Sequence, residues 1–173
     1  PSEALEKVFS PRSVAVLGVT QTPGTVPYDI FHNILSGGYR GVLYPVAPGK
    51  RSICSVKAYR YVTDIPDEVD LAVIVYPANV CDRAIAQCGE KGVRAAIMIS
   101  AGFREVGQAG ADREARVRRL CAECGIALIG PNCLGVINTD PQVSLNASFA
   151  RKKPARGRIA FLSQSGALCT AVL

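Results

Sequence analysis

Short apolar runs recur along the chain at fairly regular intervals. They are rich in valine and isoleucine, and their apolar positions follow one another without polar alternates. Such continuous runs are typical of strands that are buried on both faces of a parallel sheet. The runs are SVAVLG (13–18), GVLYPV (41–46), DLAVIVY (70–76), RAAIMIS (94–100), IALIG (126–130) and RIAFLS (158–163).

Segments with helical spacing separate the first five runs. Residues 28–35, 80–91 and 111–124 each place apolar side chains three or four positions apart, with polar residues between them. Strand and helix therefore alternate over roughly 130 residues. This alternation predicts an α/β domain over residues 1–135, with a doubly wound, mainly parallel, Rossmann-like sheet.

The pattern changes after residue 135. Residues 136–157 lose their periodicity and gather Asn, Asp, Pro and basic residues, which predicts a linker. Residues 158–173 then predict a new strand, a tight turn and a helix, the start of a second α/β domain. Because this helix shows no stop signal at Leu173, we expect the sequence to be part of a longer protein.

Composition and cysteine usage narrow the class of protein. Apolar residues make up 49% of the chain and charged residues 20%, enough for a buried core. No apolar run reaches the roughly 18 residues of a membrane span, and the segment PSEALEKVFSPRS lacks a signal-peptide core. The seven cysteines are odd in number and most lie in apolar segments. We therefore expect reduced thiols, no membrane partner and a cytoplasmic location.

The net charge of +6 has two main sources. Arg113, Arg116, Arg118 and Arg119 alternate with Asp112 and Glu114 in one helical segment, which indicates a solvated face. The other source is RKKPARGR (151–158), which lacks the aromatic residues of a single-strand binder. The charge therefore favours a small polyanionic ligand over nucleic acid.

The loop GVTQTPGTVP (18–27) follows the first strand. Gly18 allows close backbone approach, Thr20 offers a hydroxyl and an N–H, and Pro27 suits the first turn of a helix. The helix N-terminus would then attract an anion. The dinucleotide fingerprint G-x-G-x-x-G is absent, however, and an ordinary strand-to-helix connection explains this stretch equally well.

The end of the second strand restricts the choice of ligand. NAD-binding units place an acidic residue there to accept the ribose hydroxyl, but this chain reads Ala-Pro-Gly-Lys-Arg over 47–51. The basic residue Lys50 would suit a ribose phosphate. NADP and coenzyme A both carry one, and charge alone leaves both open.

Two later turns follow predicted strands at the edge where open α/β sheets bind ligands. They are SAGFRE (100–105) and GPNCLG (130–135). Asn132 could hold a carbonyl or phosphoryl oxygen, although a rigid turn bracketed by glycines also explains the second motif. We expect Cys133 to support the site rather than react, because the one histidine, His32, is far away in sequence and a nucleophilic thiol needs activation.

Taken in order, these pieces resemble the CoA-binding domain of the NDP-forming acyl-CoA synthetases, the superfamily of the succinyl-CoA synthetase α subunit. The ADP-forming acetyl-CoA synthetase branch is the most similar. The resemblance covers nearly the whole chain, and GPNCLG with SQSGAL is its most specific pair. The matching pieces are FSPRSVAVLG, YPVAPGK, IPDEVDLAVIVYPANV, AAIMISAGFREVG, GIALIGPNCLGVIN and RIAFLSQSGAL.

The resemblance implies a role for each matched position. The first loop would hold the CoA phosphates, Lys50 would lie near the adenosine 3′-phosphate, and Tyr76-Pro77 would form the adenine-side wall. The turns after the later strands would lie beside the pantetheine arm and its thiol. The residues implied are Gly18, Val19, Thr20, Thr22, Lys50, Tyr76, Pro77, Ser100, Ala101, Gly102, Phe103, Asn132 and Cys133.

This chain also departs from the family pattern. Where relatives usually read Gly-Ala-Ser, this chain has Gly18-Val19-Thr20, a change that keeps a hydroxyl. Pro27 replaces a frequent glycine, and Ala47 replaces the usual Asn before the lysine element. These changes concern affinity rather than the identity of the ligand. Ser165 and Gly166 match a second-domain turn that faces a phosphohistidine in relatives, but that histidine would lie beyond Leu173.

The resemblance therefore implies a CoA-binding domain that catalyses nothing alone and works with an ATP-grasp domain or subunit. Two alternatives remain, an NADP-binding domain of an oxidoreductase or redox regulator and a CoA-sensing domain of a protein lysine acetyltransferase. A hydrolase elbow is excluded because Ser163 and Ala167 occupy the glycine positions of G-x-S-x-G. The pair Cys121 and Cys124 is expected in the core, and no metal site is predicted.

Overall fold

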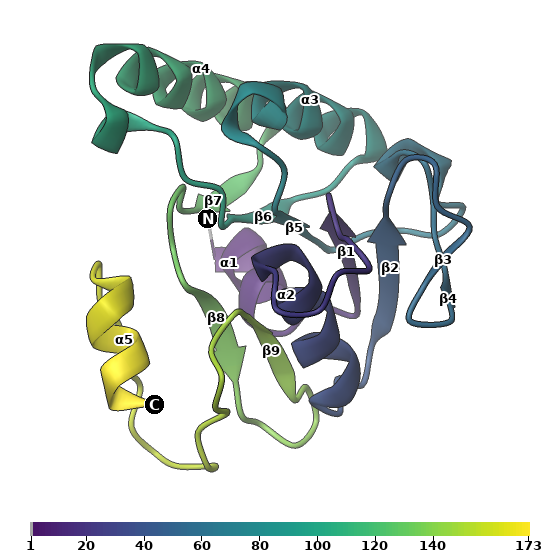
Figure 1. Cartoon of the computed structure of the whole chain (residues 1–173), viewed down its shortest axis with the longest axis vertical. Coiled ribbons are helices and arrows are strands. Elements are labelled where there is room, and N and C mark those ends of the chain that lie inside the picture. The colour runs from purple at the N-terminus through teal and green to yellow at the C-terminus, as the bar shows by residue number, and fades with distance from the viewer. Residues whose placement is uncertain (1) are drawn as a thin grey trace.

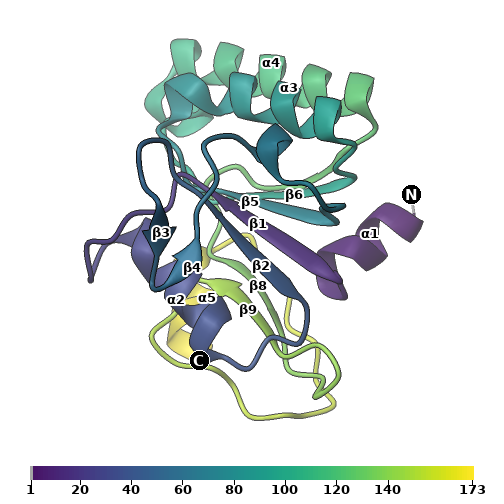
Figure 2. The same cartoon turned by 90° about the vertical axis from the view of Figure 1, so that its right-hand side faces the viewer.

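The computed structural model describes residues 2–173. Its centre is a parallel sheet with strand order β2-β1-β5-β6-β7. Helices cover both faces of the sheet (Figures 1 and 2). The predicted doubly wound α/β class is therefore confirmed, and each strand coincides with one of the first five apolar runs. The strands are β1 (Ser13–Leu17), β2 (Val42–Val46), β5 (Leu71–Ile74), β6 (Ala95–Met98) and β7 (Ala127–Ile129).

Alternate side chains of the central strands build two cores. Leu17, Ile74 and Met98 face α3 (Cys81–Lys91) and α4 (Gln108–Cys124). Neighbouring positions such as Val16 and Val73 face α2 (Val26–Ser36), which covers the opposite side. Both faces of β1, β5 and β6 are thus buried, which is why these runs are continuous. A further helix, α1 (Ser2–Phe9), precedes β1.

The predicted irregular linker is wrong for its first part. Strands β8 (Gly135–Asn138) and β9 (Leu145–Ser148) form an antiparallel hairpin instead. Its buried residues join the core beneath α2, and the Asn33 side-chain amide donates to the carbonyl oxygens of Ser148 (2.8 Å) and Ala150 (3.0 Å). A second small hairpin, β3 (Ser52–Ile53) with β4 (Val56–Lys57), follows β2.

The strand expected over 158–163 does not form. Ile159 and Leu162 are 93% and 98% exposed, and the segment pairs with no strand among the described residues. An apolar run becomes a strand only where another strand satisfies its N–H and C=O groups. Helix α5 (Gly166–Val172) does form, and the Ser165 hydroxyl accepts the Leu168 N–H at its start (3.2 Å). The division into two domains stays a prediction.

Two side-chain expectations have different outcomes. Cys121 is buried in the core, as expected, and Cys124 is partly buried against it; Cys81 and Cys88 are buried in the same core. Glu114, expected on a solvated face, is instead 5% exposed and pairs with two arginines. Within residues 2–173, no helix is long and apolar enough to cross a membrane.

Candidate functional site

The sheet reverses its winding between β1 and β5, and the carboxyl ends of these strands meet there. Gly18 follows β1 with φ +96°, and a Cβ on it would lie 2.7 Å from the Tyr76 ring. The Val75 N–H donates to the Leu17 carbonyl (3.0 Å), which holds the two strand ends together. Only glycine fits here, because both the backbone conformation and the space exclude a side chain. In open α/β sheets this reversal is the usual place for a ligand.

The loop between Gly18 and α2 is held by its own threonines. The Thr25 hydroxyl donates to the Thr22 carbonyl (2.7 Å) and lies 3.0 Å from the Thr20 hydroxyl. Thr25 is also the N-cap residue of α2, but its side chain caps no N–H of the first turn. The positive end of this helix therefore faces the loop without a side-chain cap, as an anion site requires. Pro27 occupies the first turn, as predicted.

The basic turn after β2 lies beside this loop. The Gly18 N–H donates to the Val46 carbonyl (2.9 Å), and the Gln21 side chain donates to the Ser52 carbonyl (2.8 Å). These contacts bracket the exposed residues Lys50 and Arg51. No local pattern singles out Gln21, because its contact joins segments 31 positions apart.

The turns after β6 and β7 meet on the other side of Tyr76. The Ser100 hydroxyl donates to the Tyr76 carbonyl (2.6 Å), and the Asn132 N–H donates to the Ser100 carbonyl (3.0 Å). Ser100 thus positions the strand ends, while the Asn132 side chain is exposed on a left-handed residue (φ 55°). The structure brings the predicted turns together, as their common edge of the sheet requires.

Cys133 lies beneath the last turn. Its thiol donates to the Met98 carbonyl (3.4 Å). Burial raises the pKa of this thiol to about 11 despite opposing backbone hydrogen bonds at Gly135 and Cys133. The thiol is therefore protonated at neutral pH and is a poor nucleophile.

Not every predicted residue presents a side chain to this edge. Val19 and Phe103 are buried in the two cores, so only their backbones are available to a ligand. Tyr76 is half-buried, and burial first, then Cys88 and Tyr61, raises the pKa of its hydroxyl. Pro77, Ala101 and Thr22 are exposed. The described residues hold no cluster of three or more His, Cys, Asp or Glu side chains that could bind a metal.

Comparison with known proteins assigns the chain to a family. The family model described as CoA binding domain matches residues 12–139. The chain belongs to this family of CoA-binding domains. The resemblance noted in the sequence is thereby confirmed, and the matched range contains every predicted site residue.

The CoA-binding domain has relatives among ADP-forming ligases. It is 44% identical over 98% of its length to an ADP-forming acetate–CoA ligase of Archaeoglobus fulgidus, and 39% identical over 96% to an ADP-forming 4-hydroxybutyrate–CoA ligase of Nitrosopumilus maritimus. It spans 24% of the length of each of these relatives.

Solved structures of similar proteins have the same fold. A crystal structure of a Pyrococcus horikoshii protein superposes with a TM-score of 0.92 at 41% identity, covering 97% of this chain and 38% of that one. An acetyl-coenzyme A synthetase of Ca. Korarchaeum cryptofilum, in complex with phosphate and ADP, gives 0.91 at 37% identity, covering 98% and 36%. The Rossmann-like fold is that of the family.

Proposed function

We propose that this chain is the CoA-binding part of an ADP-forming acid–CoA ligase, with CoA as a substrate of the whole enzyme. The observation that carries the proposal is the Gly18 loop beneath Tyr76 and beside Lys50, in a chain of the CoA-binding domain family. The match to a CoA-binding family model favours CoA over NADP as the ligand. The relatives are ADP-forming ligases, but their names differ in the acid.

The order of the strands supports one direction for CoA along the edge. Lys50 follows β2, which lies three strands from β6 and four from β7 in the sheet. At about 4.8 Å per strand these separations are about 14 and 19 Å. With its 3′-phosphate at Lys50, CoA would place its pyrophosphate at the Gly18 loop and α2. Its extended pantetheine arm would then reach the Ser100 and Asn132 turns.

The residues of this chain bind and orient CoA under this proposal. Lys50 supplies a charge to the 3′-phosphate, and the N–H groups of α2 face the pyrophosphate. Asn132 is an exposed donor and acceptor near the thiol end, while the protonated Cys133 takes no covalent part. The phosphohistidine and an ATP-grasp domain or subunit would belong to the rest of the enzyme. One relative, from Pyrococcus furiosus, is itself named as an alpha subunit.

Titration calorimetry of residues 1–173 with CoA, dephospho-CoA and NADPH tests the proposal. We expect CoA to bind most tightly, dephospho-CoA less tightly, and NADPH least. Tighter binding of NADPH than of CoA would overturn the proposal in favour of an NADP-binding domain. CoA binding by a protein whose following sequence encodes an acetyltransferase rather than a ligase would favour the regulatory alternative.

A further inference from the structure

The loop after β6 is held from above by α4. It comprises residues 100–107 and includes the short 3₁₀ helix η3 (Arg104–Val106). Phe103 is fully buried beneath α4, and Gly110 lies so close that a Cβ there would overlap the Phe103 carbonyl oxygen. The Arg113 guanidinium donates to the Gly102 carbonyl. Helix and loop therefore form one packed unit.

Glu114 connects the helix to the loop through ion pairs. Its carboxylate is 5% exposed and accepts from Arg104 Nε (3.2 Å) on the loop and from Arg118 Nη2 (2.9 Å) one helical turn further on. The two arginine side chains are 71% and 62% exposed, and both extend from the surface to the same buried carboxylate. A buried carboxylate is stable only while such partners remain. Only Arg104 connects it to the loop.

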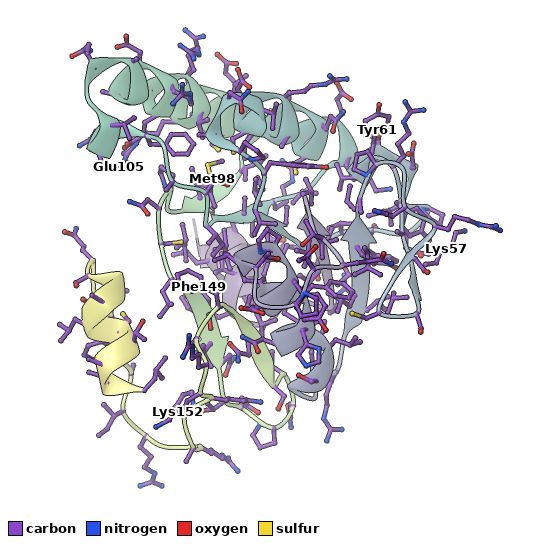
Figure 3. The ribbon with its side chains drawn as sticks, viewed as in Figure 1. Lys57, Tyr61, Met98, Glu105, Phe149 and Lys152 are labelled. Carbon is purple, nitrogen blue, oxygen red and sulfur yellow. The ribbon has the colours of Figure 1, made fainter. Side chains whose placement is uncertain are left out.

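The loop also fixes the Gly102 amide. The Glu105 carboxylate accepts the Gly102 N–H (2.5 Å), which lowers the pKa of Glu105. Figure 3 shows Glu105 projecting from this loop below α4. Gly102 itself approaches Ala78 so closely that a Cβ would lie 3.0 Å from the Ala78 side chain. The position of η3 thus determines where the backbone after Ser100 lies along the ligand edge.

We propose that Glu114 is a positioning residue that, through Arg104, holds the Ser100–Phe103 backbone in place for the pantetheine arm of CoA. The inference rests on the proposed function for the identity of the ligand. Glu114 does not touch CoA. Glu114 keeps in place the loop that would lie beside the pantetheine arm. The adenosine side at Lys50 is built from β1, β2 and α2 and does not depend on Glu114.

A matched pair of variants separates this role from general stability. Arg104→Met removes the link between Glu114 and the loop, whereas Arg118→Met removes a partner of the same acid within α4. Both side chains are mostly exposed, so both variants should fold. The ligands are CoA and adenosine 3′,5′-bisphosphate, which retains the ribose phosphate but lacks the arm. Amide hydrogen exchange at residues 102–106 provides a readout without any ligand.

We expect Arg104→Met to weaken CoA about fivefold or more and to leave adenosine 3′,5′-bisphosphate within about twofold. The 102–106 amides should exchange faster in Arg104→Met than in Arg118→Met. Equal effects of the two variants, equal losses for the two ligands, or unchanged exchange would each overturn the proposal. Failure of the unaltered chain to bind CoA would instead overturn the proposed function, and the exchange comparison would still decide whether Glu114 holds the loop.

Discussion

The two edges of the sheet use charge in opposite ways. At the amino edge, Asp70 is 6% exposed, and its carboxylate accepts from Lys7 Nζ (2.5 Å) and the Arg12 N–H (2.9 Å). At the carboxyl edge, Lys50 and Arg51 are exposed in the turn after β2, beside the loop that leads from Gly18 into α2. The N-cap residue of that helix, Thr25, makes no side-chain cap. Figure 2 shows α1 beyond one edge and the β3–β4 hairpin beyond the other.

This difference distinguishes a structural cluster from the proposed ligand site. Clefts of about 320 and 540 Å³ lie at the amino edge, and both are lined by Glu68 and Asp70. Four of the charged side chains there already form ion pairs, so the presence of a cleft alone is a poor guide to the site. They are Lys7, Arg12, Glu68 and Asp70. At the carboxyl edge, close backbone approach at Gly18 and cations left in solvent provide what a phosphate ester needs. Substitutions at the carboxyl edge should therefore affect CoA binding, and substitutions at the amino edge should affect the free energy of unfolding.

The largest effect is expected at Gly18. Gly18→Ala introduces a Cβ against the Tyr76 ring at a left-handed residue, and we expect CoA to weaken by about 3 kcal/mol, more than a hundredfold. Gly24→Ala is the matched control, because Gly24 has φ +78° in the same loop but nothing within 4 Å of the added Cβ. Titration calorimetry of both variants measures the contribution of the close approach. Equal losses would show that backbone strain alone is responsible.

A substitution at the amino edge should lower the stability of the fold and leave CoA binding unchanged. Asp70→Asn removes the charge that Lys7 and Arg12 face, and we expect a loss of about 2 kcal/mol in unfolding free energy at pH 7. Chemical denaturation measures this loss, and CoA affinity should stay unchanged. A parallel loss of affinity would contradict the separation of the two edges.

The pH dependence of that loss follows from the pKa of Asp70. Burial tends to raise this pKa, but the hydrogen bonds and charges of Lys7 and Arg12 lower it overall. The carboxylate therefore contributes stability that is complete above its unfolded pKa of about 3.9 and disappears as the pH falls through the lower folded value. The difference between Asp70→Asn and the unaltered chain should shrink below about pH 4.

A smaller effect is expected at Lys50. Lys50→Ala should weaken CoA by about 1.4 kcal/mol, roughly tenfold, because one charge-assisted contact to the 3′-phosphate is lost. Dephospho-CoA, which lacks that phosphate, should bind almost as before. Lys57 carries the same charge on β4, where it is exposed and its Nζ lies 5.2 Å from the centre of the Tyr59 ring, so Lys57→Ala is the control. Equal losses for CoA and dephospho-CoA would refute this role of Lys50.

The smallest effect is expected at Cys133. Because its thiol is partly buried and protonated, Cys133→Ser should change CoA affinity by less than about 1 kcal/mol. Calorimetry measures the change. Complete loss of binding would show that the thiol takes a direct part in holding CoA.

The local pattern of apolar residues was sufficient to predict the central strands and the helices between them. Val73 and Ile97 belong to apolar runs whose both faces are covered, so their burial could be read from adjacent positions. The β8–β9 hairpin could not be read in this way, because its stability depends on packing beneath α2 and on Asn33, more than a hundred positions away from Ser148. For residues 158–163 the apolar pattern predicted a strand that does not form, since no strand in the described part of the chain pairs with them.

The sequence by itself determined the fold class, the edge of the sheet that carries the candidate site, and the preference for a phosphate-bearing ligand at Lys50. These follow from periodicity, glycine placement and charge, which are local properties. Only the tertiary structure decided that Tyr76 lies against Gly18, that the Phe103 side chain belongs to the core, and that Glu114 is buried in an ion-pair cluster instead of lying on a solvated face. Such contacts join residues far apart along the chain, and their burial depends on which faces the whole fold brings together.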